Sequence, residues 1–326
     1  MKVAIGVDIG GTNIKIVIVS KEGAVLASRK YPTPSVPKNL SVTAADLFTG
    51  VLKGFLKEES VIALLSPASS ATEIVGIGIG IAGLIDSKRG IVIESPNIPS
   101  INGFNIKEAF EKEFSLPVNV DNDANTCAYG EKWVGVGKNF NSFIMLTLGT
   151  GLGSGFIYNG ELFTGAFETG HMVIEPNGRL CTCGNLGCLE SYASGRAIME
   201  KVISSLEKGE ASILTESCGG SFYKITPELI YKTALDGDSL CRKAFREFGQ
   251  YLGIGIANLI NLLSPDAVII GGGLVGAWEL FMQDLQQEAS KRSFDPLYAN
   301  VKIIKSTLTE ECGSIGAAGL IFKATA

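Results

Sequence analysis

The chain has 326 residues, of which 46% are hydrophobic and 19% are charged, and this composition excludes an intrinsically disordered protein. At roughly 150 residues per domain, the length predicts two compact domains. The net charge is −5 and no long run of Lys or Arg occurs, so we expect no nucleic acid partner. The 40 glycines fall in short clusters, which indicates tight turns and close backbone approach.

Two features bear on membranes and on the cellular compartment. The stretch from Phe248 to Pro265 carries no charge, but it contains Gln250, Asn258 and Asn261. A membrane span needs about 20 mostly apolar residues, so we predict a buried core helix here and no membrane partner.

Of the seven cysteines, three lie close together and four are scattered, which is typical of metal ligands in a cytosolic chain. We therefore expect a cytoplasmic protein.

The first half alternates apolar stretches with glycine turns and amphipathic segments. Three short apolar stretches separated by tight turns predict an antiparallel meander, and later segments with helical or strand periodicity predict further elements. The expected elements are strands at 3–9, 14–20 and 24–31, a helix over 44–60, a glycine-laced strand over 74–86, a helix over 106–115 and a short strand within 116–123.

The second half repeats the opening arrangement. A strand at 143–149, a Gly-Thr-Gly turn, a strand at 153–159 and a strand from Gly160 copy the strand, glycine turn, strand design of the N-terminus. Two copies of one unit predict two related domains, joined at a hinge over one cleft. Beyond a Cys-rich insertion we expect helices at 194–208, 226–262 and 277–291 and a strand at 267–271, and we assign no role to 209–225.

Two glycine turns are candidates for phosphate binding. In Asp8-Ile-Gly-Gly-Thr12, backbone N–H groups can converge on an anion, and Asp8 can hold a Mg²⁺ that the phosphate also binds. The turn within 148–155 offers the same chemistry. Ordinary hairpins are the alternative, and the matched pair favours phosphate binding.

Two other clusters fit the dinucleotide pattern GxGxxG. Residues 78–83 lead into LIDS instead of a helix, which argues against this function. Residues 271–276 follow a strand and precede a helix, but no acidic residue follows at the end of the next strand to bind a ribose. An NAD-linked oxidoreductase stays a weaker alternative, and no P-loop motif occurs.

Asp121-Asn-Asp-Ala-Asn125 follows a strand end. A carboxylate here could accept the proton of a substrate hydroxyl while Asn122 binds a neighbouring hydroxyl. Such sequences also form helix N-caps, and that alternative stays open.

One histidine and three nearby cysteines predict a metal site. His171 is the only histidine, and Cys181, Cys183 and Cys188 are the cysteines nearest to it. This donor set matches a closed tetrahedral zinc site with a structural role. Three core thiols or a redox pair are the alternatives. The other cysteines, namely Cys127, Cys218, Cys241 and Cys312, are interpreted as small buried hydrophobic residues.

Two glutamates flank these ligands. Glu168 and Glu190 each lie close to a predicted metal ligand, which would hold the carboxylate rigidly. Rigid carboxylates suit hydrogen bonding to several hydroxyls of one sugar. The alternative is a hydrogen bond to the metal-bound His171.

Together these segments resemble the ROK family (repressors, open reading frames and sugar kinases) of the actin/hexokinase-like ATPase superfamily. The resemblance covers nearly the whole chain, and the Pro-Asn-Gly-Arg segment at 176–179 is most similar to the bacterial glucokinase branch. It rests on VDIGGTNIK (7–15), GIGIAGLID (78–86), VDNDANTCAYGE (120–131), LTLGTGLGSG (146–155), GAFETGH (165–171), PNGRLCTCGNLGCLESYAS (176–194) and GGGLVG (271–276).

The resemblance implies an α/β fold of two RNase H-like domains with mixed sheets and flanking helices around a central cleft. It implies a smaller domain of residues 1–120 with a helix at about 312–326, and a larger domain of residues 121–311 with the zinc-binding insertion. Family precedent implies a homodimer or homotetramer. Many members begin with a DNA-binding helix-turn-helix. Because the first glycine turn begins so early, we expect none here.

The resemblance also implies roles for individual residues. Asp123 matches the catalytic base that takes the proton of the hexose 6-hydroxyl, and His171 would serve both zinc and the sugar. The positions that hold sugar hydroxyls are Asn97, Asn122, Asp123, Glu168, His171 and Glu190. The positions that hold ATP and its Mg²⁺ are Asp8, Gly10, Gly11, Thr12, Lys15, Thr150, Gly151, Gly272 and Gly273. Ser154 departs from the pattern, because a third glycine is more usual there.

We therefore expect an ATP-dependent hexose kinase that acts on glucose. The alternatives within the family are an N-acetylglucosamine or N-acetylmannosamine kinase and a fructokinase. A sugar-binding regulator without catalytic activity is the alternative outside the enzymes.

Overall fold

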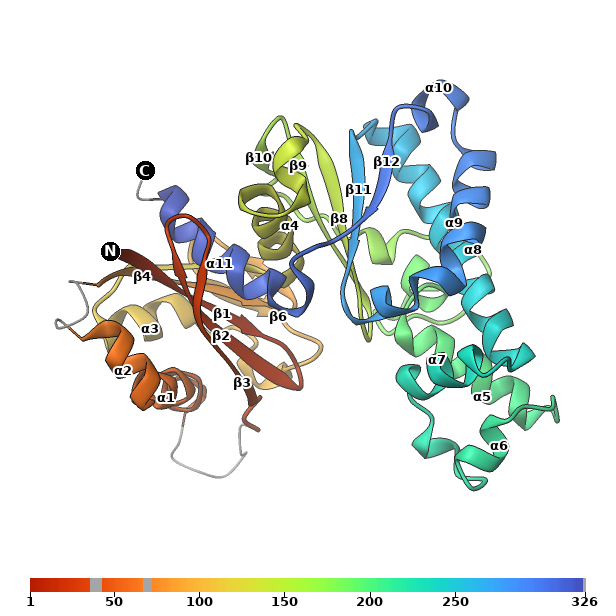
Figure 1. Cartoon of the computed structure of the whole chain (residues 1–326), viewed down its shortest axis with the longest axis horizontal. Coiled ribbons are helices and arrows are strands. Elements are labelled where there is room, and N and C mark those ends of the chain that lie inside the picture. The colour runs from red at the N-terminus through yellow and green to blue at the C-terminus, as the bar shows by residue number, and fades with distance from the viewer. Residues whose placement is uncertain (36–42, 67–71, 325–326) are drawn as a thin grey trace. The chain divides into compact units, whose positions relative to one another are not determined.

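The computed structural model describes residues 1–35, 43–66 and 72–324. The chain divides into two compact units, each of α/β type with a mixed sheet and flanking helices (Figure 1). Unit 1 comprises Met1–Asn141, Gly155–Ala166 and Ser306–Ala326, and unit 2 comprises Ser142–Ser154 and Phe167–Lys305. The domain boundaries expected from the sequence stay a prediction.

The first sheet has the strand order β3–β2–β1–β4–β7. The antiparallel meander expected at the N-terminus is confirmed by the pairing of β1 with β2 and of β2 with β3. β4 runs parallel to β1, and β7 runs parallel to β4. The strands are β1 (Lys2–Ile9), β2 (Asn13–Ser20), β3 (Val25–Pro32), β4 (Glu73–Ile81) and β7 (Val118–Asn122).

Two expected elements of unit 1 are interrupted. The predicted helix over 44–60 ends at Leu56, and a second helix begins at Glu59. The predicted strand over 74–86 breaks after Ile81, because the backbone turns at Gly83 with a φ of 138°. The remaining elements of this unit are α1 (Ala44–Leu56), α2 (Glu59–Leu65), β5 (Leu84–Asp86), β6 (Ile91–Glu94), α3 (Ile106–Phe114), α4 (Asp123–Trp133) and α11 (Cys312–Ala324).

The alternation of side chains along β1 determines what covers each face of the first sheet. Val3, Ile5, Val7 and Ile9 point to one face and share a buried core with residues of α1 and α3. Ala4 points to the opposite face and packs with residues of α11. Helices therefore cover both faces, with α1 and α3 on one side and α11 on the other (Figure 1).

The face toward α11 is built from glycines. A Cβ atom at Gly6 would lie 1.8 Å from the carbonyl oxygen of Ser314, and one at Gly78 would lie 1.8 Å from that of Ala317. Gly6 of β1 and Gly78 of β4 therefore form a flat surface on which the backbone of α11 lies, while Gly80 of β4 makes room for Thr126 of α4. This packing accounts for the GxGxxG pattern at 78–83, which sits in a strand and its turn.

The second sheet has the strand order β10–β9–β8–β11–β12. β11 runs parallel to β8 and to β12, and β9 pairs antiparallel with β10. This order matches that of the first sheet strand for strand, which confirms the predicted repeat. The strand expected from Gly160 is only Glu161–Leu162. The strands are β8 (Phe143–Leu148), β9 (Leu152–Tyr158), β10 (Glu161–Leu162), β11 (Ala267–Gly271) and β12 (Lys302–Lys305).

The single helix predicted over 226–262 is wrong. The chain breaks at Gly237, whose φ is 99°, and Asp238 then caps a new helix by accepting a hydrogen bond from the backbone N–H of Cys241 at 2.8 Å. The helices of unit 2 are α5 (Gly195–Glu207), α6 (Leu214–Ser217), α7 (Pro227–Leu235), α8 (Ser239–Leu263), α9 (Trp278–Arg292) and α10 (Asp295–Tyr298).

The uncharged stretch after Phe248 lies in α8 and is a core helix, as predicted. Gly249 and Gly253 approach the backbone of α9 so closely that added Cβ atoms would lie 2.3 and 2.5 Å from its carbonyl oxygens. Within the described ranges, no helix combines the length and the apolar character that a membrane crossing requires.

The glycine contacts of α11 predict a strong effect of one methyl group. In the Gly316→Ala variant, the new Cβ would lie 1.7 Å from the carbonyl oxygen of Thr126 in α4. Because that atom belongs to the backbone, we expect the free energy of unfolding to fall by about 1–3 kcal/mol or more. Urea denaturation followed by circular dichroism measures the change.

The matched control is Gly54→Ala in α1. Gly54 also lies in a helix, but an added Cβ would have no atom within 4 Å. This variant should be neutral or more stable by up to about 1 kcal/mol, because alanine favours helix. Equal unfolding curves for Gly316→Ala and the unchanged protein would contradict the packing argument.

Candidate functional site

Acidic residues gather at one edge of the first sheet. The parallel register aligns Asp8 of β1 with Gly80 of β4, and Gly80 with Asp121 of β7. The carboxyl ends of these three strands therefore meet at one edge, and Asp123 begins α4 directly after β7. The residues predicted as metal ligand and base thus come from the same edge of the sheet, at the ends of β1 and β7 on either side of β4.

The N-cap alternative is confirmed for Asn122. Its side-chain oxygen accepts hydrogen bonds from the backbone N–H groups of Ala124 at 2.8 Å and Asn125 at 3.2 Å. Its amide nitrogen donates to the carbonyl oxygen of Gly83 at 2.9 Å. Asp123 is the first helical residue, and its carboxylate accepts from the N–H of Ala124 at 2.9 Å. The cap therefore fixes the backbone that carries Asp123.

Asp121 organises this helix start and was missed by the sequence analysis as a site residue. Its carboxylate accepts from the N–H of Asn122 at 2.7 Å and from the amide of Asn125 at 2.9 Å. Burial raises the pKa of Asp121, while these hydrogen bonds lower it. The acidic pattern at 121–123 does not itself distinguish a supporting carboxylate from a reacting one.

The environment of Asp8 disfavours a negative charge. The pKa of Asp8 is raised to about 7, first by burial and then by the negative charge of Asp123, whereas Lys15 lowers it. Two carboxylates are thus close enough to influence each other, as in many sites that bind a cation or move a proton.

The first glycine turn lies next to Asn97. A Cβ atom at Gly11 would lie 2.9 Å from the Cβ of Asn97, so only glycine fits at this contact. Thr33 holds the turn from the other side, because its hydroxyl donates to the carbonyl oxygen of Gly10 at 2.6 Å and its N–H donates to that of Thr12 at 2.9 Å. No motif pointed to Thr33.

Lys15, predicted to contact the nucleotide, lies opposite Asp8 in the register of β1 and β2. Its Nζ donates to the carbonyl oxygen of Glu310 at 2.7 Å and lies 3.7 Å from the Glu310 carboxylate. Lys15 therefore has a partner within unit 1, in the segment that leads into α11.

In unit 2, the predicted metal ligands come together. His171, Cys181, Cys183 and Cys188 each offer one ligand atom, and these atoms lie within 4.8 Å of one another. Two of the contacts are 3.7 Å long, from Cys181 Sγ to His171 Nδ1 and from Cys183 Sγ to Cys188 Sγ. The predicted grouping is confirmed, and all seven cysteines are free thiols.

The two 3.7 Å distances can be compared with the spacing of ligand atoms around one tetrahedral zinc ion. With Zn–S bonds of about 2.3 Å and Zn–N bonds of about 2.1 Å, ligand atoms at two corners of a tetrahedron lie about 3.6–3.8 Å apart. The two observed distances match that spacing. A histidine and three thiols also form a donor set that binds zinc in preference to Mg²⁺ or Ca²⁺, which favour oxygen ligands.

Glu190 contacts the second glycine turn. Its Oε2 accepts from the backbone N–H of Leu152 at 2.8 Å, and its Oε1 accepts from the Thr182 hydroxyl at 3.3 Å. A Cβ atom at Gly151 would lie 2.4 Å from Oε2. The turn therefore has a glycine at position 151 because any side chain there would collide with the Glu190 carboxylate. This carboxylate is one of the groups predicted to bind the sugar.

Ser154, the departure from the family pattern, has a structural function. Its hydroxyl donates to the carbonyl oxygen of Phe167 at 2.5 Å and accepts from the N–H of Thr169 at 3.1 Å. These two bonds enclose Glu168 and hold its backbone. The pKa of Glu168 is raised by burial and by Glu190, against an opposing effect of His171. The motif alone did not reveal this function.

The glycine cluster at 271–276 lies beside the end of β8. Gly272 has a φ of 89°, and a Cβ there would lie 2.4 Å from the carbonyl oxygen of Leu148. Both segments of unit 2 predicted to bind the nucleotide, the turn at 149–151 and this cluster, therefore lie at the carboxyl edge of the parallel strands β8 and β11.

The remaining cysteines are mostly core residues, as predicted. Cys218, Cys241 and Cys312 are buried, whereas Cys127 keeps partial exposure. Cys312 donates its thiol proton to the carbonyl oxygen of Cys127 at 3.2 Å, which links α11 to α4.

Comparison with known proteins places this arrangement in a family. The sequence pattern of the ROK family matches residues 4–324. A glucokinase of Streptomyces coelicolor is 35% identical, and the match covers 98% of both chains. A xylose repressor of Caldicellulosiruptor bescii is 33% identical, and the match covers 97% of this chain and 77% of the repressor.

A solved structure shows the same fold. The ROK family glucokinase of Streptomyces griseus, crystallised in complex with glucose and AMPPNP, superimposes with a TM-score of 0.81 at 34% identity. The superposition covers 98% of this chain and 99% of that chain. The expected α/β fold of the actin/hexokinase-like kinases is thereby confirmed. On its sequence and its fold, this chain belongs to the ROK family.

Proposed function

We propose that the chain is an ATP-dependent hexose kinase that transfers the γ-phosphoryl group to the 6-hydroxyl of its sugar, with glucose as the preferred substrate. The observation that carries this proposal is the pair Asp8 and Asp123. Asp8 lies near the carboxyl end of β1 and Asp123 directly follows β7, the two strands that flank β4 in one sheet; a glycine turn follows Asp8, and the charge of Asp123 raises the pKa of Asp8.

Asp123 is the residue that would take the proton of the attacking hydroxyl. Its position at the first turn of α4 is fixed by the Asn122 cap and by the hydrogen bond from Ala124. A carboxylate held in this way can orient the hydroxyl and accept its proton as the phosphoryl group arrives. Phosphoryl transfer depends mainly on such positioning and on charge stabilisation.

Asp8 would hold Mg²⁺ together with the phosphates of ATP. The raised pKa of Asp8 indicates that a cation placed there would relieve an unfavourable negative charge. When bound, the ion would neutralise charge that develops on the transferred group. The backbone N–H groups of the turn at Gly10, Gly11 and Thr12 are the donors that we assign to phosphate oxygens.

Unit 2 would supply the other contacts. We assign Thr150 and Gly151 to the phosphates, Gly272 and Gly273 to the adenosine, and Glu168, His171 and Glu190 to sugar hydroxyls, with Asn97 and Asn122 of unit 1. Zinc would bind His171 through Nδ1, the atom that lies 3.7 Å from Cys181 Sγ, which leaves Nε2 for the sugar. The glucokinase relatives, one of them crystallised with glucose and AMPPNP, support glucose and ATP as the ligands.

A sugar-binding regulator is the second candidate. It is favoured by the xylose repressor of Caldicellulosiruptor bescii, which matches 97% of this chain at 33% identity. A regulator would bind the sugar without turning over ATP, so a turnover assay separates the two candidates.

The first test is the release of ADP from Mg-ATP with glucose, mannose, fructose, N-acetylglucosamine or N-acetylmannosamine. We expect the highest kcat/KM with glucose, measured by coupling ADP release to NADH oxidation. A maximum with an acetylated sugar would keep the kinase and change its substrate. Absence of turnover on every sugar, with folded and zinc-loaded protein, would favour the regulator.

The Asp123→Asn variant tests the proposed base. Asparagine has the same shape and keeps an oxygen for the hydrogen bond from Ala124, but it accepts no proton. We expect kcat to fall about 10²–10⁴-fold, while the Kd of glucose measured by titration calorimetry changes by less than about threefold.

The neighbouring Asp121→Asn is the matched control for this loss. An amide oxygen at position 121 can still accept from Asn122 and Asn125, so we expect kcat to stay within about tenfold of the unchanged enzyme. If Asp123→Asn kept half of the activity, Asp123 could not be the base.

The Cys183→Ser variant tests the zinc site. Cys183 is exposed, so serine is tolerated sterically, but the loss of one thiolate opens the donor set. We expect zinc content, measured by plasma mass spectrometry, to fall from about one ion per chain to near zero, together with a lower Tm. The buried Cys218→Ser, outside the cluster, should keep its zinc. Unchanged zinc in Cys183→Ser would exclude the site.

A further inference from the structure

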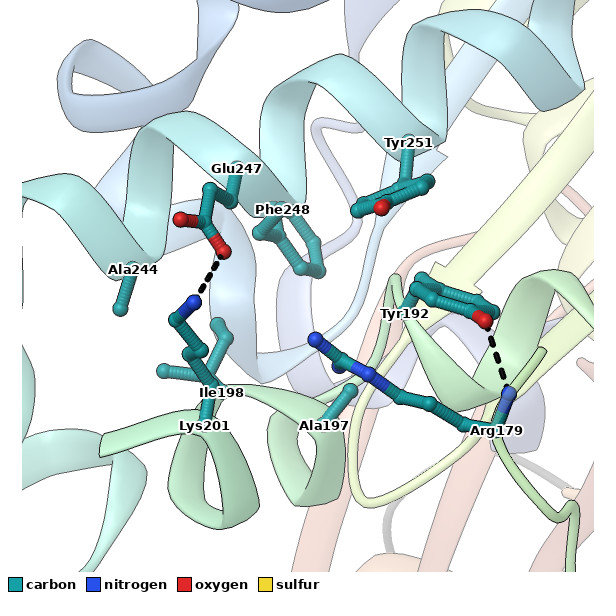
Figure 2. A pocket seen from close by; sticks show the side chains of 9 residues that line it. All are labelled: Arg179, Tyr192, Ala197, Ile198, Lys201, Ala244, Glu247, Phe248 and Tyr251. Carbon is teal, nitrogen blue, oxygen red and sulfur yellow. Dashed lines mark hydrogen bonds and ion pairs between the residues drawn. The ribbon is translucent and has the colours of Figure 1, made fainter. Parts of the chain in front are cut away.

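Tyr192 makes three contacts at the end of the Cys-rich segment. Its hydroxyl accepts a hydrogen bond from the backbone N–H of Arg179 at 2.8 Å. The guanidinium carbon of Arg179 lies 4.6 Å from the centre of its ring. Its ring centre lies 4.3 Å from that of Tyr251 in α8. Figure 2 shows this group, with Tyr192 facing Tyr251 and bonded to Arg179.

The pair Arg179 and Tyr192 closes residues 179–192 into a loop. Arg179 also donates from Nη1 to the carbonyl oxygen of Ser191 at 3.2 Å and accepts from the N–H of Gly187 at 2.8 Å. Three of the four predicted zinc ligands and Glu190 lie within this loop. We call the contacts between Arg179 and Tyr192 the clasp.

The clasp consists of tightly packed protein groups. Tyr192 is 6% exposed, and a Cβ atom at Gly178 would lie 2.1 Å from its hydroxyl oxygen. The free space among the side chains of Figure 2 is about 10 Å³, room for roughly one water molecule. The group therefore holds the loop and leaves no room for a ligand of its own.

We infer that Tyr192 is a positioning residue, which holds the loop in the arrangement that zinc and Glu190 require before any ion binds. The clasp uses only protein groups, so it reduces the conformational freedom that metal binding would otherwise have to remove. The part of this inference that concerns Glu190 and the sugar rests on the proposed kinase function. The part that concerns zinc does not.

The Tyr192→Phe variant of the full chain tests the clasp. It removes the hydroxyl but keeps a ring for Arg179 and Tyr251. We expect a three- to tenfold higher Kd for zinc, measured by competition with a chromophoric chelator. In metal-free protein, trypsin should cut after Arg179 several times faster in the variant, as followed by mass spectrometry.

Two further variants make the test specific. Tyr251→Phe removes a hydroxyl from a tyrosine that packs against Tyr192. The Tyr251 hydroxyl has no hydrogen-bond partner among the described residues, so this variant should leave the Kd for zinc and the cleavage rate unchanged. Gly178→Ala should weaken zinc binding as Tyr192→Phe does, because its methyl group displaces the hydroxyl. Equal zinc Kd values for Tyr192→Phe and the unchanged protein, or an equal effect of Tyr251→Phe, would overturn the inference.

These measurements need neither sugar nor ATP, so they are independent of the kinase proposal. If the kinase proposal also holds, Tyr192→Phe should raise the KM for the sugar about three- to tenfold with an unchanged KM for ATP. An unchanged sugar KM with weakened zinc binding would overturn only the link to Glu190.

Discussion

The close approach of α11 to the first sheet is the constraint on which the carboxylate edge depends. The helix backbone lies directly on glycines of β1 and β4, with no side chain between them. Asp8 points to this same face, and a Cβ atom at Gly313 would lie 2.9 Å from its carboxyl carbon. The packing that orders the sheet therefore also encloses Asp8 and raises its pKa.

Unit 2 also depends on close contacts at glycines, here between loops and strand ends. The turn after β8 carries Gly151, which makes room for the Glu190 carboxylate, and Gly272 fits against the end of β8. Glycine thus provides close contact between two predicted site segments in each unit. The unit also contains the cluster of His171 with three cysteines, and the clasp holds the Cys-rich loop that carries these cysteines.

Much of the fold could be predicted because the apolar periodicity is strong and the turns are marked by glycine. The meander, the repeat, the core helix α8 and the grouping of His171 with three cysteines were all predicted from the sequence pattern. The break at Gly237 was missed because apolar residues at helical spacing continue on both sides of it and outweighed the turn and N-cap signal of Asp236-Gly237-Asp238.

The supporting residues of the site were the hardest to foresee. Thr33 and Ser154 act through hydrogen bonds to backbone groups more than ten residues away, and Asp121 acts on the helix start that directly follows it; none of these bonds leaves a periodic pattern. Asn122 shows a different limit, because the same residue fits both a helix cap and a ligand contact. Only the geometry reveals the cap.

The discontinuity of unit 1 has a consequence for synthesis. Its helix α11 is translated after all of unit 2, although it covers a face of the first sheet. While the ribosome makes residues 142–305, the glycine face of β1 and β4 lacks its helix and exposes apolar surface. Unit 1 therefore cannot complete its fold during the first part of translation, whereas unit 2 emerges whole before it. This order leaves the nascent chain most exposed to aggregation, and most dependent on chaperones, in the interval before α11 leaves the ribosome.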